Sequence, residues 1–198
     1  MTKTSKFDSA YLRRVNCVKT FCTIREHGWI SRSELADITG LSRATVSETV
    51  RELLEREFVR EVGSDNTQRG RPPVKLEVNP TRFYLIAVEI DVGWIVVAIT
   101  TLVGEILVQR REEFRTHDYD FVLNLCVSTV DRLLRQQSIH RDDVLGIGVA
   151  VPGQVDLNRR VVTFAPNLRW RDVSLADDLE RDLNLPVLVS NEAMLGAM

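Results

Sequence analysis

Residues 31–57 read SRSELADITGLSRATVSETVRELLERE and set the architecture of the first part of the chain. Ser31, with Glu34 three positions later, forms a capping box, which starts a helix by satisfying backbone amides of its first turn. Gly40 follows after about two turns and can supply the left-handed residue that ends a helix. Ser42 is placed to cap a second, longer helix with an apolar face. A short helix, a glycine turn and a longer amphipathic helix together predict a helix-turn-helix motif.

Another helix is predicted upstream, over residues 10–26, so that this part of the chain would form a three-helix unit. Apolar side chains recur at helical spacing in all three segments, and we expect them to face a shared core. The residues concerned are Leu12, Val15, Val18, Cys22, Leu35, Ile38, Val46, Val50, Leu53 and Leu54.

The outward side of the helix that begins after Ser42 starts with small and polar residues. Small side chains allow a helix end to approach base edges in the major groove, where Arg43 can bond guanine or phosphate. Arg51 can hold the phosphate backbone. We therefore predict that double-stranded DNA is bound by Ser42, Arg43, Ala44, Ser47, Glu48 and Arg51. The alternative is a three-helix bundle whose polar face is only solvated.

Two alternating segments follow, FVREV at 58–62 and VKLEV at 74–78. Each alternates apolar and polar residues as a half-buried strand does. The intervening GSDNTQRGRPP is rich in turn formers and is predicted to be a loop. A hairpin directly after a helix-turn-helix indicates a wing.

The tip of this hairpin carries Arg69, Gly70, Arg71 and Pro72, a run that resembles the core of an AT-hook. Glycine lets the backbone lie flat on the floor of the minor groove, and arginines enter an A·T-rich groove because its potential is strongly negative. We therefore add Arg69, Gly70 and Arg71 to the predicted DNA contacts. The alternative is a solvated loop that contacts nothing.

Charge and composition divide the chain. Residues 1–80 carry a net charge of +3 and residues 81–198 a net charge of −5, within a total of −2. We predict a winged helix-turn-helix DNA-binding domain at 1–80 and a second domain at 81–198. No apolar run approaches the roughly 20 residues of a membrane span. The N-terminal residues lack a signal-peptide core, so we expect a cytoplasmic protein without membrane contact. The three cysteines show no CxxC spacing and are expected to be reduced.

The second domain is predicted to be a mixed α/β fold. Nearly continuous apolar runs indicate buried central strands, and short gaps between the first three strands predict a meander. The expected strands and helices are strands at 83–91, 94–101 and 105–114, a helix at 119–136, a strand within 143–153, a short strand and loop at 159–170, a helix within 172–185 capped near Ser174 or Asp172, and a strand at 186–191. Three strands, helix, strand, helix, strand is the order of an RNase H-like or actin-like lobe.

Three runs in this domain, GIGVAVPGQVD at 146–156, APNLRW at 165–170 and NEA at 191–193, resemble the ROK family of bacterial sugar kinases and related repressors. The helix-turn-helix and the run RGRPPVKLEVNP at 69–80 resemble the winged helix of that family's repressor branch. The resemblance implies an actin- or hexokinase-like fold, of which this chain holds the first lobe and lacks the second. It also implies a repressor of sugar-utilisation genes that responds to a small sugar ligand. We further expect a homodimer, because one winged helix makes few contacts and operators are commonly palindromic.

The resemblance further implies a sugar site at Gly153, Asn167, Asn191 and Glu192. Glu192 stands where the family's kinases have the aspartate that takes the proton from the sugar hydroxyl. Alternative roles are a loop-capping amide for Asn167 and a favourable acid in the first turn of a helix for Glu192.

The kinases of this family carry a D-x-G-G-T phosphate loop, and this chain departs from it. The corresponding run is EIDVGW at 89–94, in which Asp91 and Trp94 add a negative charge and bulk. We therefore expect no kinase activity, no cofactor and, since the cysteines fit no zinc motif, no metal. Two alternatives stay open: a sugar kinase with an added DNA-binding end, and a fragment that binds DNA regardless of sugar.

Overall fold

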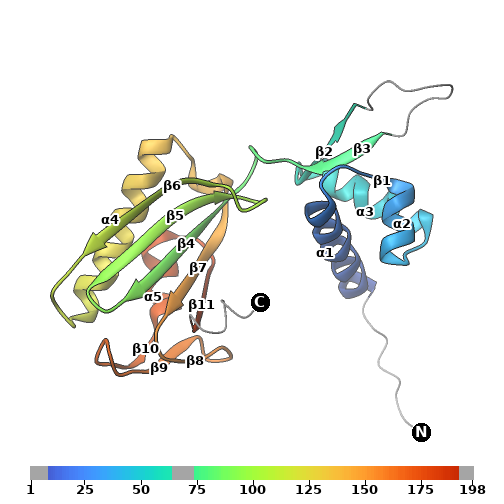
Figure 1. Cartoon of the computed structure of the whole chain (residues 1–198). Coiled ribbons are helices and arrows are strands. Elements are labelled where there is room, and N and C mark those ends of the chain that lie inside the picture. Colours follow the sequence, from blue (N-terminus) through green and yellow to red (C-terminus); the bar gives the residue numbers. More distant parts are fainter. Residues whose placement is uncertain (1–8, 64–73, 192–198) are drawn as a thin grey trace, which may run out of the picture. The chain divides into compact units, whose positions relative to one another are not determined.

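The computed structural model describes residues 9–63 and 74–191, which form two compact units, Met1–Arg82 and Phe83–Met198. The first unit combines helices with a small sheet, and the second is a sheet with helices (Figure 1). The mixed α/β prediction is confirmed. Within the described ranges, no helix has the length and apolarity that a membrane crossing requires.

The first unit is a three-helix cluster with an antiparallel hairpin. Its sheet has the strand order β1-β3-β2, and β2 and β3 pair antiparallel as the two arms of the predicted wing. The helices and strands are α1 (Ser9–His27), β1 (Ile30–Ser31), α2 (Arg32–Thr39), α3 (Arg43–Glu55), β2 (Val59–Val62) and β3 (Lys75–Val78). The two-residue strand β1 was not predicted.

The predicted capping signals operate as expected. The Ser31 side chain accepts a hydrogen bond from the Glu34 amide, and the Glu34 carboxylate accepts one from the Ser31 amide at 2.8 Å. Gly40 ends α2 in the left-handed region, with φ of 68°. The Ser42 hydroxyl accepts from the Thr45 amide at 3.1 Å and so caps α3. These local contacts fix the turn between α2 and α3.

The predicted core face of α1 was wrong. Leu12, Val15 and Val18 are exposed, Cys22 is half-buried, and Thr20 and Ile24 are buried instead. Burial of Thr20 is tolerated because its hydroxyl is hydrogen-bonded to the Thr49 hydroxyl of α3 at 3.1 Å. An apolar pattern cannot anticipate a polar face that becomes buried through such a pair.

The core predicted for α2 and α3 is largely confirmed. Leu35, Val46, Val50 and Leu53 are buried, while Leu54 is half-buried. Ile38, also predicted to face the core, is exposed because α2 turns its Leu35 and Ala36 side toward the neighbouring helices.

The second unit is built on a five-stranded sheet of order β11-β7-β4-β5-β6. Strands β4, β5 and β6 form the predicted antiparallel meander, and β7 and β11 extend it in parallel with β4. The strands and helices of this sheet are β4 (Tyr84–Asp91), β5 (Trp94–Thr101), β6 (Ile106–Glu113), α4 (Tyr119–Gln137), a 3-10 turn (Arg141–Asp143), β7 (Val144–Val151), α5 (Leu175–Leu183) and β11 (Val187–Asn191).

Helices α4 and α5 lie together on one face of this sheet (Figure 1). Val122, Cys126, Val130 and Leu133 of α4 are buried there as predicted, and Leu125 is partly buried. Because parallel strands end at one edge, the carboxyl ends of β4, β7 and β11 lie along the same edge of the sheet, where ligands bind in open α/β folds.

A second, three-stranded sheet of order β10-β9-β8 follows β7. It consists of β8 (Gln154–Asp156), β9 (Val161–Ala165) and β10 (Trp170–Val173). The sequence predicted β9 but neither β8 nor β10. Of the two caps predicted for α5, Ser174 and Asp172, the structure has Ser174 at the N-cap position. Trp170 is buried against Tyr119, with ring centroids 5.1 Å apart, so tertiary packing holds this segment as a strand.

Candidate DNA-binding and sugar-binding sites

The predicted DNA contacts on α3 form one exposed face. Ala44, Ser47, Glu48 and Arg51 recur at three- and four-residue spacing and are all exposed. Ser42 and Arg43 extend this face to the N-terminus of the helix and are exposed too. The first turn contains no acidic residue, so the positive end of the helix is available to a phosphate group.

Two of these side chains make weak ion pairs within the first unit. Arg13 of α1 lies 3.9 Å from the Glu48 carboxylate, and Arg51 lies 3.7 Å from Glu55. All four groups are more than half exposed, so these pairs contribute little to stability and can exchange for contacts with DNA.

A stronger contact anchors α3 to α1 behind this face. Arg13 Nε donates to Glu52 Oε2 at 2.7 Å, and Cys17 Sγ lies 3.5 Å from the same oxygen. The hydrogen bond from Arg13 holds the pKa of the Glu52 carboxyl below its ordinary value. Desolvation raises the pKa of the Cys17 thiol. The sequence analysis missed this contact, because a pair 39 residues apart leaves no local pattern.

The base of the wing is held by side chains on both faces of its sheet. Glu77 of β3 accepts from Arg60 Nε and from the Trp29 indole, both at 2.6 Å. Arg32 of α2 donates to Glu61 of β2 at 2.8 Å. These contacts fix the two arms of the hairpin against the helices.

The predicted minor-groove contacts at the tip of the wing are Arg69, Gly70 and Arg71. All three lie outside the described residues.

In the second unit, the turn between β4 and β5 stands where a kinase of the family would hold phosphate. The Asp91 carboxylate accepts from the Val92 amide at 2.7 Å, and Gly93 has φ of 83°. The guanidinium of Arg111 lies 4.3 Å from the centre of the Trp94 ring. Val92 and Trp94 add side chains and Asp91 adds a carboxylate, so this turn lacks the bare, amide-rich concavity that binds phosphate.

Gly153 follows β7 at the same edge of the sheet. Its φ is 151°, and a Cβ atom there would lie 2.5 Å from the Phe164 carbonyl oxygen and 2.9 Å from Ala165 Cα. The Asn191 amide at the end of β11 donates a hydrogen bond to the Gly153 carbonyl. The structure therefore brings Gly153 and Asn191 together in a closely packed turn.

The other two predicted sugar contacts stand apart from this pair. Asn167 is exposed in the turn between β9 and β10, and its side chain makes no hydrogen bond to any residue that the structure describes. The loop-capping alternative therefore has no support there. Glu192 lies outside the described residues.

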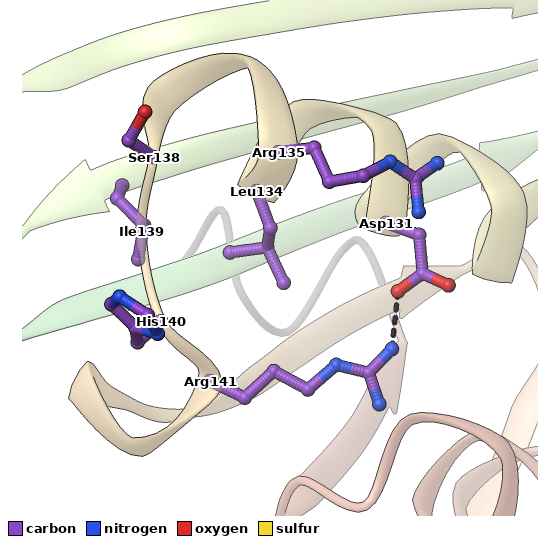
Figure 2. A pocket seen from close by; sticks show the side chains of 7 residues that line it. All are labelled: Asp131, Leu134, Arg135, Ser138, Ile139, His140 and Arg141. Carbon is purple, nitrogen blue, oxygen red and sulfur yellow. Dashed lines mark hydrogen bonds and ion pairs between the residues drawn. The ribbon is translucent and has the colours of Figure 1, made fainter.

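Figure 2 shows a surface hollow at the end of α4 that contains none of the predicted site residues. Arg141 forms an ion pair with Asp131 across it and donates to the Leu183 carbonyl at 2.9 Å. These bonds join α4 to the end of α5, so the polar groups of the hollow have a structural role. Across residues 9–63 and 74–191, His, Cys, Asp and Glu do not gather into a group of three or more suited to a metal ion.

Comparisons with known proteins match both units. The ROK family model matches residues 85–198, and the MarR family model matches residues 23–70. The xylose repressor of Bacillus subtilis is 30% identical over 190 residues, which cover 96% of this chain and 49% of the repressor. The transcriptional repressor Mlc of Escherichia coli is 24% identical over 183 residues, covering 91% and 45%.

Solved structures give the same fold. A ROK family transcriptional regulator homologous to Mlc has a TM-score of 0.76 at 24% identity and covers 91% of this chain and 46% of its own. A ROK family glucokinase from Streptomyces griseus has a TM-score of 0.52 at 28% identity, covering 58% and 35%. The chain spans about half the length of the curated relatives that it matches. The MarR-type winged helix is thus joined to a partial sugar-kinase-like domain, and the chain belongs to the ROK family.

Proposed function

We propose that this chain is the DNA-binding and ligand-sensing part of a sugar-responsive transcriptional repressor. The observation that carries the proposal is the exposed face of α3 in the same chain as a ROK unit whose phosphate-loop position holds Asp91, Val92 and Trp94. Relatives that align with almost the whole chain are named xylose repressors, which supports the same function.

In this proposal α3 enters the major groove with Ser42, Arg43, Ala44 and Ser47 toward the bases. Arg51 binds phosphate, and Glu48 either accepts from a cytosine amino group or remains paired with Arg13. Arg69 and Arg71 at the tip of the wing enter the adjacent minor groove. One winged helix makes few contacts, so two copies bind a palindromic operator as a homodimer.

The ligand is proposed to be a sugar, with xylose as the first candidate because of the names of the relatives. Gly153, Asn167, Asn191 and Glu192 are the proposed contacts. A sugar releases DNA only if it binds more tightly to the conformation that cannot hold the operator.

A kinase activity is the second candidate, because the second unit is similar to a ROK family glucokinase. Two features of the turn between β4 and β5 weigh against it. The Asp91 carboxylate would repel phosphate groups, and the stacked Trp94 and Arg111 side chains occupy the space beside the turn. We therefore expect no transfer of phosphate from ATP to xylose or glucose.

The test is selection of bound fragments from a random DNA pool at fixed salt concentration. The native chain should enrich a palindromic motif flanked by A·T runs, and the Arg69→Ala/Arg71→Ala variant should lose the flank preference. Arg135→Ala/Arg159→Ala, which removes the same charge from exposed positions of the second unit, is the matched control. Failure to enrich any motif would overturn the DNA-binding proposal.

The ligand is tested on the selected motif. Xylose should lower the affinity of the native chain for this DNA, and Asn191→Ala should reduce the sugar response without changing affinity in its absence. DNA binding that no sugar alters would favour a constitutive DNA-binding chain instead.

A further inference from the structure

Glu48 is an unexpected residue on a face proposed to contact DNA. Of the six residues proposed for this role at α3, it alone carries a negative charge, which the phosphate groups of DNA repel. The fold does not account for this acid. Its carboxylate is more than half exposed, and its ion pair with Arg13, at 3.9 Å, is too exposed to contribute appreciably to stability. The reason for an acid at this position therefore lies in what α3 binds.

Arg13, the partner of Glu48, is anchored at a different carboxylate. Its Nε donates to Glu52 Oε2 at 2.7 Å, and the Glu52 side chain is only 16% exposed. Arg56 binds the other oxygen of this carboxylate, Oε1, at 2.9 Å. Since both oxygens of Glu52 are engaged, this carboxylate is a fixed point on α3. It holds the Arg13 guanidinium so that another of its nitrogens, Nη1, lies beside Glu48.

Glu48 and Glu52 lie about one turn apart on the same side of α3. Two carboxylates at this spacing repel each other, and the Arg13 guanidinium lies within reach of both. Side chains of a helix lean toward its N-terminus, so Glu48 extends over the turn that contains Ala44, whose small methyl group leaves space beside it. Among the described residues, Arg13 faces Glu48 Oε1, and Glu48 Oε2 accepts no hydrogen bond. One oxygen of Glu48 is therefore available to a donor outside the chain.

We propose that Arg13 is a positioning residue that holds Glu48 toward the bases, so that the Glu48 carboxylate recognises a cytosine. Oε1 of Glu48 stays beside Arg13, and Oε2 accepts a hydrogen bond from the N4 amino group of cytosine in the major groove. The inference rests on the proposed function, because it requires α3 to enter that groove. It adds a residue of α1, a different helix, to those that set the base preference.

The positive charge of Arg13 acts only when DNA is bound. In the free chain, water screens the attraction between Arg13 and Glu48. When α3 enters the groove, water leaves the space around this pair, and the same attraction grows because the local dielectric constant falls. The hydrogen bond to Glu52 keeps the Arg13 guanidinium from moving away to a phosphate group. Without Arg13, the phosphates would turn the Glu48 carboxylate away from the bases.

A purely structural role is the alternative for Arg13, since its bond to Glu52 joins α1 to α3. Loss of such a role would lower the affinity for every DNA sequence by the same factor. Loss of the positioning role would change the preference at one base pair and leave the other positions as they are. The base preference at single positions of the bound motif therefore distinguishes the two roles.

Selection of bound fragments with the Glu48→Gln variant identifies the base that Glu48 contacts. The native chain should prefer cytosine at one position of the selected motif. Glu48→Gln should change the preference at this position to adenine, because a glutamine amide pairs with N6 and N7 of adenine. A good contact of this kind discriminates against the wrong base by about fivefold or more. A variant that selects the native motif unchanged would overturn the proposal.

Arg13→Gln tests the positioning role. It should lower the cytosine preference at this same position by about threefold or more and leave the other positions unchanged. Arg56→Gln is the matched control, because it removes the same charge from the same carboxylate of Glu52 but is not paired with Glu48. It should keep the native preference at this position. Circular dichroism confirms that both variants are folded. A folded Arg13→Gln chain that binds every sequence more weakly by one factor would leave Arg13 a structural role and refute the proposal.

The two substitutions are then combined. In the Glu48→Gln chain, adding Arg13→Gln should leave the adenine preference unchanged, because a neutral amide needs no compensating charge. A further change of preference at this position would show that Arg13 acts independently of Glu48 and would overturn the proposal. A native chain that enriches no motif would refute the repressor function and this inference together. An enriched motif that responds to neither residue would refute this inference alone and keep the repressor function.

Discussion

Substitution of Gly153 by alanine should specifically damage the second unit. The added Cβ would lie 2.5 Å from the Phe164 carbonyl oxygen, a backbone atom that no side-chain rotation can move away. At φ of 151°, an L-residue is also strained, by about 1–3 kcal/mol. Overpacking of a close backbone contact adds about 1–3 kcal/mol. Gly153→Ala should therefore lower the free energy of unfolding of this unit by about 2–6 kcal/mol.

Urea denaturation followed by near-ultraviolet circular dichroism measures this loss, because buried Trp170 lies in the second unit. Gly148→Ala is the matched control: the same substitution in neighbouring β7 meets no atom within 4 Å. It should change the free energy of unfolding by less than about 1 kcal/mol. The reasoning is refuted if Gly153→Ala unfolds at the native midpoint, or if Gly148→Ala loses as much stability.

Three smaller predictions concern single contacts. Hydrogen bonds from Ser31 hold the pKa of Glu34 below its ordinary value. Their contribution to the free energy of unfolding is therefore complete above the pKa that Glu34 has in the unfolded chain, and it is lost as the pH falls through the lower pKa that Glu34 has in the folded chain. The stability gap between the native chain and Glu34→Gln should therefore close on acidification in urea titrations. Burial raises the pKa of Cys126 to about 12, so iodoacetamide should label this thiol only after unfolding, as mass spectrometry would detect. Tyr119→Phe removes a 2.6 Å hydrogen bond to Asp178 and should cost about 1–3 kcal/mol in thermal unfolding.

Local signals in the sequence predicted most of the fold. The capping box at Ser31 and the glycine at position 40 act between residues a few positions apart, so their outcome does not depend on the rest of the chain. The hairpin and the meander were predictable for the same reason, since adjacent strands joined by short turns pair with each other.

The errors arose where distant parts of the chain decide the result. The exposed side of α1 could not be recognised, because apolar side chains at helical spacing look the same in sequence whether the face is buried or exposed. Strand β10 was missed because Trp170 is held by Tyr119 from α4, 51 positions earlier in the sequence. The Arg13–Glu52 contact also depends on packing between two helices. The residues proposed to contact DNA and sugar remain predictions. The five of them on α3 and the N-cap residue Ser42 are all exposed.

The edge of the sheet at which β4, β7 and β11 end differs in character between its two ends. Its β7–β11 end is closely built, since Gly153 admits no side chain and the Asn191 amide braces the turn. Its β4–β5 end has the opposite character, with the Asp91 carboxylate and the Trp94–Arg111 stack in the phosphate-loop position. An enzyme that transfers phosphate needs a sugar site at the β7–β11 end and a phosphate site at the β4–β5 end. A sensor needs only the sugar site. The difference between the two ends therefore supports our proposal of a sugar sensor over a sugar kinase.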